Sequence, residues 1–188
     1  MIIYDLEIQK CISKSGETRL PDFQYCDGFK DFFNMGVSCV VTFDTARNEY
    51  RIFDEFMLDD LKVVFKRTDV IAGFNILNFD NNVLRPYEFE IPDSKCYDLL
   101  AEIARAAGTP NDYKGLGLGA VCEANFGAKK TGDGAKAPML YQQKRFGELF
   151  DYCLADVRLT KRLLDRILEI GNIINPRNGQ WIRVNRPR

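Results

Sequence analysis

Two carboxylates interrupt the first apolar segment of the chain, which runs from Met1 to Ile8. They belong to Asp5 and Glu7, and residues i and i+2 of a β-strand point to the same face, so both side chains would leave the strand on one side. Two like charges near the protein interior repel each other and lose hydration, which is costly unless an opposite charge compensates. The usual compensating group is a cation. The pair therefore predicts half of a divalent-metal site, with further ligands supplied from elsewhere in the chain.

The rest of the chain alternates between strand-like and helix-like segments. Strands are predicted at 1–8, 36–44, 49–54, 70–74 and 95–98, with a hairpin turn at 45–48. Helices are predicted at 56–66, 78–85, 99–107, 114–126 and 145–171, and a loop at 127–138. A hairpin followed by strands that alternate with helices predicts an α/β fold, in which a mixed central sheet is flanked by helices.

The composition excludes several classes of protein. The 188 residues, of which 46% are hydrophobic, fit one domain with a sizeable core, and no apolar run approaches the roughly 20 residues of a membrane span. The net charge of −1 is not the strongly basic balance of a protein that coats nucleic acid. An enzyme that holds one strand end remains compatible with this charge, because bound metal ions would supply positive charge locally.

The chain contains no histidine. This absence excludes His general bases, His metal ligands and Ser-His or Cys-His nucleophilic machinery. The six cysteines form no CxxC pair, so we interpret them as reduced packing thiols of a cytoplasmic protein rather than as disulfides or a zinc site. The first residues show neither a basic n-region nor a small-residue cleavage site, and a secretory signal is not expected.

Two later segments contain acids that could complete the metal site. Asp80 would lie in the first turn of the helix predicted at 78–85, where a carboxylate also interacts favourably with the helix dipole. Asp156 lies in the long helix predicted at 145–171, four residues after Tyr152, so these two residues share a helix face. Asp156 could therefore bind a metal ion while the Tyr152 hydroxyl reaches a water molecule or a phosphate.

At these positions the sequence resembles the DEDD superfamily of 3′→5′ exonucleases, also called DnaQ-like. The first motif, Asp5-x-Glu7, is short and unspecific on its own. The second, Gly73-x-Asn75-x-x-x-Phe79-Asp80, is similar to that of the proofreading exonuclease domains of family B DNA polymerases. The third, Tyr152-Cys153-Leu154-x-Asp156, is typical of the tyrosine subgroup, called DEDDy. A chain without histidine cannot be an active member of the branch that uses His in place of Tyr152.

The resemblance covers roughly residues 1–171 and implies an RNase H-like fold. It predicts an exonuclease domain at 1–175, with an insertion at 9–35 after the first strand, and a basic tail at 176–188. The palm, fingers and thumb of a polymerase are absent from this sequence, so a stand-alone nuclease domain is expected.

The resemblance also implies a mechanism. Asp5, Glu7, Asp80 and Asp156 would hold two Mg²⁺ or Mn²⁺ ions, for which carboxylate and water ligands are suited. One ion would lower the pKa of the attacking water and the other would stabilise the leaving 3′ oxygen, while Tyr152 orients that water. The expected reaction releases nucleoside 5′-monophosphates from the 3′ end of single-stranded DNA or from unpaired 3′ ends.

Two other functions are compatible with the sequence. An exoribonuclease is the first alternative, because the metal site does not distinguish the two sugars and no motif here reveals a contact to a 2′-hydroxyl group. A catalytically silent nucleic-acid-binding module is the second. A membrane partner is not expected under any of the three interpretations.

A second set of residues is assigned to the substrate strand: Leu6, Asn75, Phe79, Lys129 and Lys130. An aromatic ring can stack on any base, and lysines can contact phosphates without sequence preference. The alternatives are that Phe79 belongs to the core, that Asn75 caps the following turn, and that the lysine loop, which also contains Lys136, is simply solvated. Asp98 is interpreted as a structural or helix-capping acid, with a fifth metal ligand as its alternative.

Overall fold

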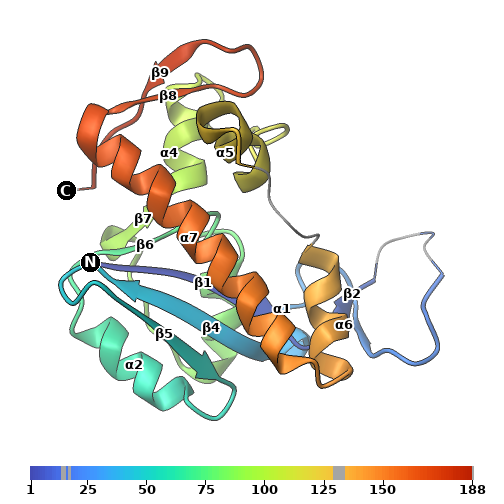
Figure 1. Cartoon of the computed structure of the whole chain (residues 1–188). Helices are drawn as coiled ribbons and strands as arrows, with labels where there is room; N and C mark the ends of the chain where they lie inside the picture. Colours follow the sequence, from blue (N-terminus) through green and yellow to red (C-terminus); the bar gives the residue numbers. More distant parts are fainter. Residues whose placement is uncertain (14–15, 17, 129–133, 188) are drawn as a thin grey trace.

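The computed structural model describes residues 1–13, 16, 18–128 and 134–187, and a five-stranded sheet forms its centre (Figure 1). The strands lie in the order β5-β4-β1-β6-β7. Their bounds are Ile2–Ile8 for β1, Val37–Asp44 for β4, Glu49–Asp54 for β5, Ile71–Gly73 for β6 and Cys96–Asp98 for β7. β1 pairs antiparallel with β4 and parallel with β6, so the predicted mixed sheet is confirmed.

Helices cover both faces of this sheet, as predicted for an α/β fold. On one face lie the helices that follow β5 and β6, namely α2 (Leu58–Lys66) and α3 (Asp80–Leu84). The other face is covered by α4 (Leu99–Ala106), α5 (Leu118–Phe126) and α7 (Phe146–Ile170). In Figure 1, α7 runs diagonally across β1 and β4. No helix in the described ranges is long and apolar enough to cross a membrane.

β1 separates two hydrophobic cores, and its side chains alternate between them. Ile2, Tyr4, Leu6 and Ile8 point into the core beneath α2 and α3, which we call the α2–α3 core. Ile3 points into the opposite core beneath α7, which we call the α7 core. Because the side chains of a strand alternate with a period of two, Asp5 and Glu7 continue the row begun by Ile3 and face α7.

The segment predicted as an insertion forms a small substructure beyond the end of β1. It contains the short parallel strands β2 (Cys11–Ile12) and β3 (Tyr25–Cys26), followed by α1 (Phe32–Met35). Helix α6 (Ala137–Gln142) docks against it, because the Gln142 side chain exchanges hydrogen bonds with the backbone of Gln24. The loop predicted up to residue 138 ends earlier than expected, because α6 begins at Ala137. The proline that suggested a loop lies in the first turn of this helix, where proline is tolerated.

Residues predicted as a basic tail fold back onto the domain. β8 (Asn172–Ile174) and β9 (Trp181–Arg183) form an antiparallel hairpin after α7, which spans the expected boundary at 175/176. Val184 is buried in the α7 core, and the Tyr97 hydroxyl donates a hydrogen bond to the Asn185 carbonyl. Through these contacts the segment closes the end of the molecule opposite the insertion (Figure 1).

Gly73, the last residue of β6, has no room for a side chain. A Cβ atom at this position would overlap the Ile76 side chain and lie 2.8 Å from the Tyr4 carbonyl oxygen. We expect Gly73→Ala to lower the free energy of unfolding by about 2 kcal/mol, because overpacking against a backbone atom forces the strands apart. Urea denaturation followed by circular dichroism measures this change.

Gly147→Ala is the matched control. Gly147 lies in the first turn of α7, and no described atom outside its own turn lies within 4 Å of the position that a Cβ atom would take. Alanine there should leave stability unchanged or raise it slightly, since it favours the helix more than glycine does. Equal stability of the Gly73→Ala protein and the wild type would contradict the tight approach of β6 to β1.

Candidate metal centre

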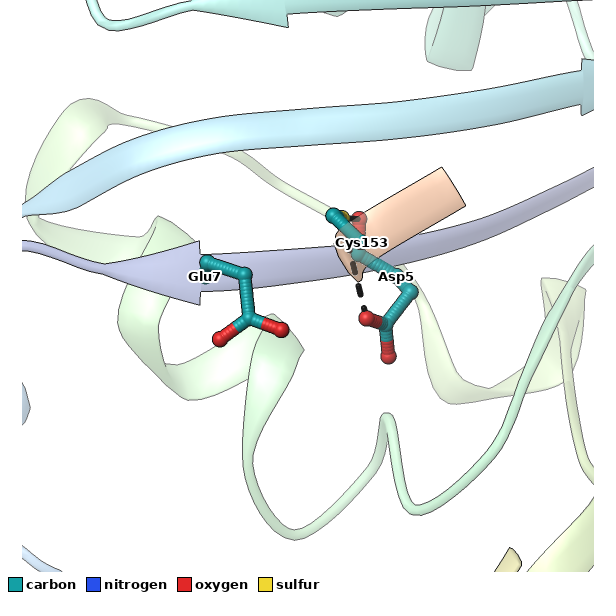
Figure 2. Close-up of side chains that lie close together, drawn as sticks. All are labelled: Asp5, Glu7 and Cys153. Atoms are coloured by element: carbon teal, nitrogen blue, oxygen red, sulfur yellow. Dashed lines mark hydrogen bonds between the residues drawn. The ribbon is translucent and has the colours of Figure 1, made fainter. Parts of the chain in front are cut away.

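Asp5, Glu7 and Cys153 form a compact cluster between β1 and α7 (Figure 2). One carboxylate oxygen of each acid and the Cys153 Sγ all lie within 4.8 Å of one another. Glu7 is buried and Asp5 is half-buried, and the pairing of β1 with β4 shifts register directly after Glu7. Such irregularities often occur beside active sites because they redirect side chains. The two acids predicted to share one face of β1 are therefore brought together as expected.

Cys153 is the member of this cluster that sequence reasoning missed. A packing thiol is the expectation for this residue, and it is indeed fully buried in the α7 core. Its Sγ nevertheless donates to the Asp5 carbonyl at 3.4 Å and to Asp5 Oδ2 at 3.7 Å. Burial, together with the neighbouring Cys39, Asp5 and Glu7, raises the pKa of this thiol well above its ordinary value. One signal is present in the sequence: Cys153 precedes Asp156 by three residues and therefore shares its side of the helix.

Asp80 reaches the same part of β1 from α3. Its Oδ1 accepts a hydrogen bond of 3.2 Å from the backbone N–H of Leu6, the residue between the two acids of the first motif. The pairing of β6 with β1 extends only to Ile3 and Ala72, so at Leu6 a side chain can take the place of a parallel strand as the partner of the backbone. Burial raises the pKa of Asp80 to about 7, against the lowering effect of hydrogen bonds from its own backbone N–H and that of Leu6.

Asp156 and Tyr152 lie on α7, on the turns that pack against β1. Asp156 is buried and Tyr152 is half-buried. The Tyr152 hydroxyl lies 3.6 Å from the position that a Cβ atom would take at Gly134, so the segment leading into α6 approaches it closely. Among the described residues, the group within 4.8 Å contains neither Asp80 nor Asp156. The structure thus brings Asp80 to the backbone of β1 and Cys153 to Asp5, with Asp156 one turn further along α7.

Asp98 has the structural role that its position predicted. It is buried at the N-cap of α4, where its side chain accepts hydrogen bonds from the backbone N–H groups of Leu100 and Ala101. It also accepts hydrogen bonds of 2.9 and 3.0 Å from Asn75 and Leu77, a connection that the sequence did not reveal. These contacts support the helix-capping interpretation over a fifth metal ligand, because they occupy both carboxylate oxygens.

The structure places Asn75 in a turn. Its backbone has a φ of 68°, its carbonyl accepts hydrogen bonds from the N–H groups of Asn78 and Phe79, and its side-chain oxygen accepts one from Asn78. Phe79 is half-buried and packs edge-on against Phe32 with ring centroids 6.1 Å apart. Asn75 thus stabilises the turn mainly through its backbone carbonyl, and Phe79 packs against the edge of the α2–α3 core. A contact with substrate stays a prediction for each of them.

The remaining substrate assignments have different positions. The Leu6 side chain is buried in the α2–α3 core, so only its backbone, through the N–H bonded to Asp80, reaches the acidic cluster. Lys136 is exposed in the turn Gly134–Lys136, while Lys129 and Lys130 lie outside the described residues.

Comparisons with known proteins give a likeness of fold. No protein-family model matches the sequence, and no curated protein matches it. Among solved structures, the chain is similar to the family B DNA polymerase from the hyperthermophilic archaeon Pyrobaculum calidifontis, with a TM-score of 0.58 and 16% sequence identity. The match covers 89% of this chain and 24% of the polymerase, so the chain corresponds to about a quarter of that protein. At this identity the likeness concerns the fold alone.

The raised pKa of Asp80 predicts a pH dependence for the metal-free protein. The folded state keeps the Asp80 proton up to about pH 7, whereas the unfolded chain releases it near the ordinary value of 3.8. Stability in EDTA should therefore fall as the pH rises between these two values and stay low above pH 7. Asp80→Asn should remove this fall and raise the melting temperature at pH 8 by roughly 2–8 °C, which corresponds to about 1–2 kcal/mol.

Differential scanning fluorimetry of both proteins from pH 4 to pH 8 measures this difference. The asparagine keeps a side-chain oxygen that can accept the hydrogen bond from the Leu6 N–H group. The two proteins therefore differ in the ionisable group and not in this hydrogen bond. Parallel pH profiles for the two proteins would show that Asp80 is not a destabilising buried carboxylate.

Proposed function

We propose that this chain is a metal-dependent 3′→5′ exonuclease that acts on single-stranded DNA or on unpaired 3′ ends. The observation that carries the proposal is the Asp5–Glu7 pair on the α7 side of β1, with Asp80 hydrogen bonded to the backbone between them. Asp80 brings a third carboxylate to this stretch of β1 from α3, and Asp156 is a buried carboxylate three residues after Cys153 on α7. The likeness of fold to part of a DNA polymerase is consistent with a nucleic-acid substrate.

The strand order supports the finer description of the fold as RNase H-like. An antiparallel β5-β4-β1 half is joined at β1 to the parallel strands β6 and β7, and the acids lie where β1 extends beyond β6. Under this proposal the exonuclease domain spans residues 1–175, with residues 9–35 as an insertion after β1. The hairpin of β8 and β9 closes the other end.

The chemistry of the residues fits hard divalent cations. The donors are carboxylates from Asp5, Glu7, Asp80 and Asp156, and oxygen ligands are those preferred by Mg²⁺ and Mn²⁺. Burial at Asp80 disfavours the ionised carboxylate, so a cation would relieve an unfavourable charge as it binds. When bound, the ions would supply an activated water and stabilise the charge on the leaving 3′ oxygen.

The side chains around the acids would then position the reactants. The Tyr152 hydroxyl, on the same face of α7 as Asp156, would orient the attacking water towards phosphorus. This hydroxyl lies 3.6 Å from the position that a Cβ atom would take at Gly134, so the segment before α6 runs close to it. Proton transfer would use solvent and the carboxylates, since the chain contains no histidine.

The first test is hydrolysis of a 3′-labelled oligonucleotide. We expect release of labelled mononucleotide in Mg²⁺ or Mn²⁺ and none in EDTA. Asp5→Ala and Asp156→Ala should each lower the rate by at least about a hundredfold, because even partners of metal ligands are worth 10- to 100-fold. Both variants should stay folded, since removing a carboxylate also relieves repulsion.

Asp60→Ala is the control, because Asp60 is an exposed acid on α2. Matched DNA and RNA strands in the same assay decide between the deoxyribonuclease and exoribonuclease forms of the proposal. If neither strand is cleaved but both bind, the chain is a silent binding module instead.

Tyr152→Phe tests the positioning of water. We expect the rate to fall about 10- to 100-fold at saturating metal, because a misplaced nucleophile loses much of the benefit of orientation. The metal concentration for half-maximal rate should change little. Tyr141→Phe is the matched control, since the Tyr141 hydroxyl donates to the carboxylate of Glu55, which is not one of the four proposed ligands. A Tyr152→Phe enzyme with the wild-type rate would refute the water-orienting role.

A further inference from the structure

The Cys153 thiol is the one non-carboxylate group in the metal-centre cluster of the described residues. Its side chain is fully buried, and its Sγ lies within hydrogen-bond distance of the Asp5 carbonyl, at 3.4 Å, and of Asp5 Oδ2, at 3.7 Å. Donor–acceptor distances are longer for sulfur than for oxygen or nitrogen because the sulfur atom is larger. The thiol therefore contacts both the backbone and the side chain of one proposed metal ligand.

The surroundings of Cys153 fix the position of this thiol. Cys153 lies on the part of α7 that packs on β1. Cys39 of β4, which pairs with Glu7 in the sheet, is also hydrogen bonded with the Cys153 thiol. Both cysteines are completely buried, so the thiol has little freedom to turn away from Asp5. Figure 2 shows the Asp5 and Glu7 carboxylates pointing to the same side of β1, with Cys153 reaching Asp5 from the helix.

We propose that Cys153 is a positioning residue, whose S–H group holds the Asp5 carboxylate in the orientation in which Asp5 and Glu7 together receive a cation. This inference rests on the proposed function, since it requires the metal centre at Asp5 and Glu7. The other oxygen of the Asp5 carboxylate points away from the thiol in Figure 2, and it is the atom that we assign to the ion. A group that orients a metal ligand acts on metal affinity more than on the chemical step.

Two other roles for Cys153 make different predictions. A purely packing residue would affect stability but not metal affinity. A direct thiolate ligand would be irreplaceable by serine and would favour soft cations such as Cd²⁺ over Mn²⁺. A hydrogen-bond donor can be replaced by serine, which keeps the donor, and not by alanine or valine, which lack one.

The experiment is calorimetric titration of Mn²⁺ into the metal-free protein, with no nucleic acid present. We expect Cys153→Ala and Cys153→Val to weaken Mn²⁺ binding about tenfold without changing its stoichiometry. Valine is larger than cysteine and leaves no cavity, whereas alanine leaves one, so a loss of affinity common to both variants reports the lost donor. Cys153→Ser should bind Mn²⁺ within about twofold of the wild type, because the hydroxyl is also a donor. In hydrolysis assays, the non-donor variants should need more Mg²⁺ for half-maximal rate but approach the wild-type rate at saturation.

Cys26→Ala is the matched control. The Cys26 thiol is equally buried and donates to the Cys11 carbonyl at 3.5 Å, in the small substructure beyond the end of β1 and away from the four proposed ligands. This variant should lose stability without losing Mn²⁺ affinity.

Each outcome decides the inference. Unchanged Mn²⁺ affinity in the alanine and valine variants would overturn the positioning role and leave the metal centre standing. If the serine variant binds Mn²⁺ as weakly as the alanine variant and the wild type prefers Cd²⁺, the thiol is a metal ligand and the donor role is overturned. A wild type that binds no Mn²⁺ would overturn the metal centre, and the proposed function and the role of Cys153 with it.

Discussion

The structure depends on β1, a strand between two hydrophobic cores that nevertheless carries two acidic side chains. The strand separates two hydrophobic cores, and its even-numbered residues fill one of them without exception. The odd-numbered row begins with Ile3 in the other core and then places Asp5 and Glu7 beneath α7. Carboxylates in such a place must be protonated, hydrogen bonded or paired with a cation. The elements around the end of β1 supply hydrogen bonds, and a cation would neutralise the charge that hydrogen bonds alone leave in place.

A series of hydrogen bonds connects α4 to the part of β1 that carries the acids. Asp98 caps α4 and, with the same carboxylate, binds the backbone N–H groups of Asn75 and Leu77. The turn fixed in this way leads directly into α3, whose first residue is Asp80. Asp80 in turn binds the Leu6 N–H group, beyond the point where β6 stops pairing with β1. The second motif therefore directs one carboxylate to β1, and Asp98 supports it from outside the motif.

Much of this arrangement could be predicted because it follows local periodicity. The alternation in β1 puts Asp5 and Glu7 on one face, and helical spacing puts Tyr152 beside Asp156. Other features could not be predicted, since they depend on contacts between distant segments. Helix α6 is short and starts with Ala137 and Pro138, and its docking on the insertion through Gln142 has no local signal. The contact of Cys153 with Asp5 likewise needs the packing of α7 across β1, and the spacing of Cys153 from Asp156 indicates only a shared side of the helix.

The loss of stability caused by burying these carboxylates is itself an argument about function. Asp80 is buried with a pKa raised to about 7, so the ionised carboxylate destabilises the metal-free fold at neutral pH. An asparagine would keep the Leu6 hydrogen bond without that charge, and apolar residues at Asp5 and Glu7 would extend the α7 core. A module that only bound nucleic acid would gain stability from these replacements and lose nothing at the centre. Departures from the most stable sequence are expected where function requires them, and here they coincide at one end of one strand. That coincidence favours a working metal centre over a silent fold.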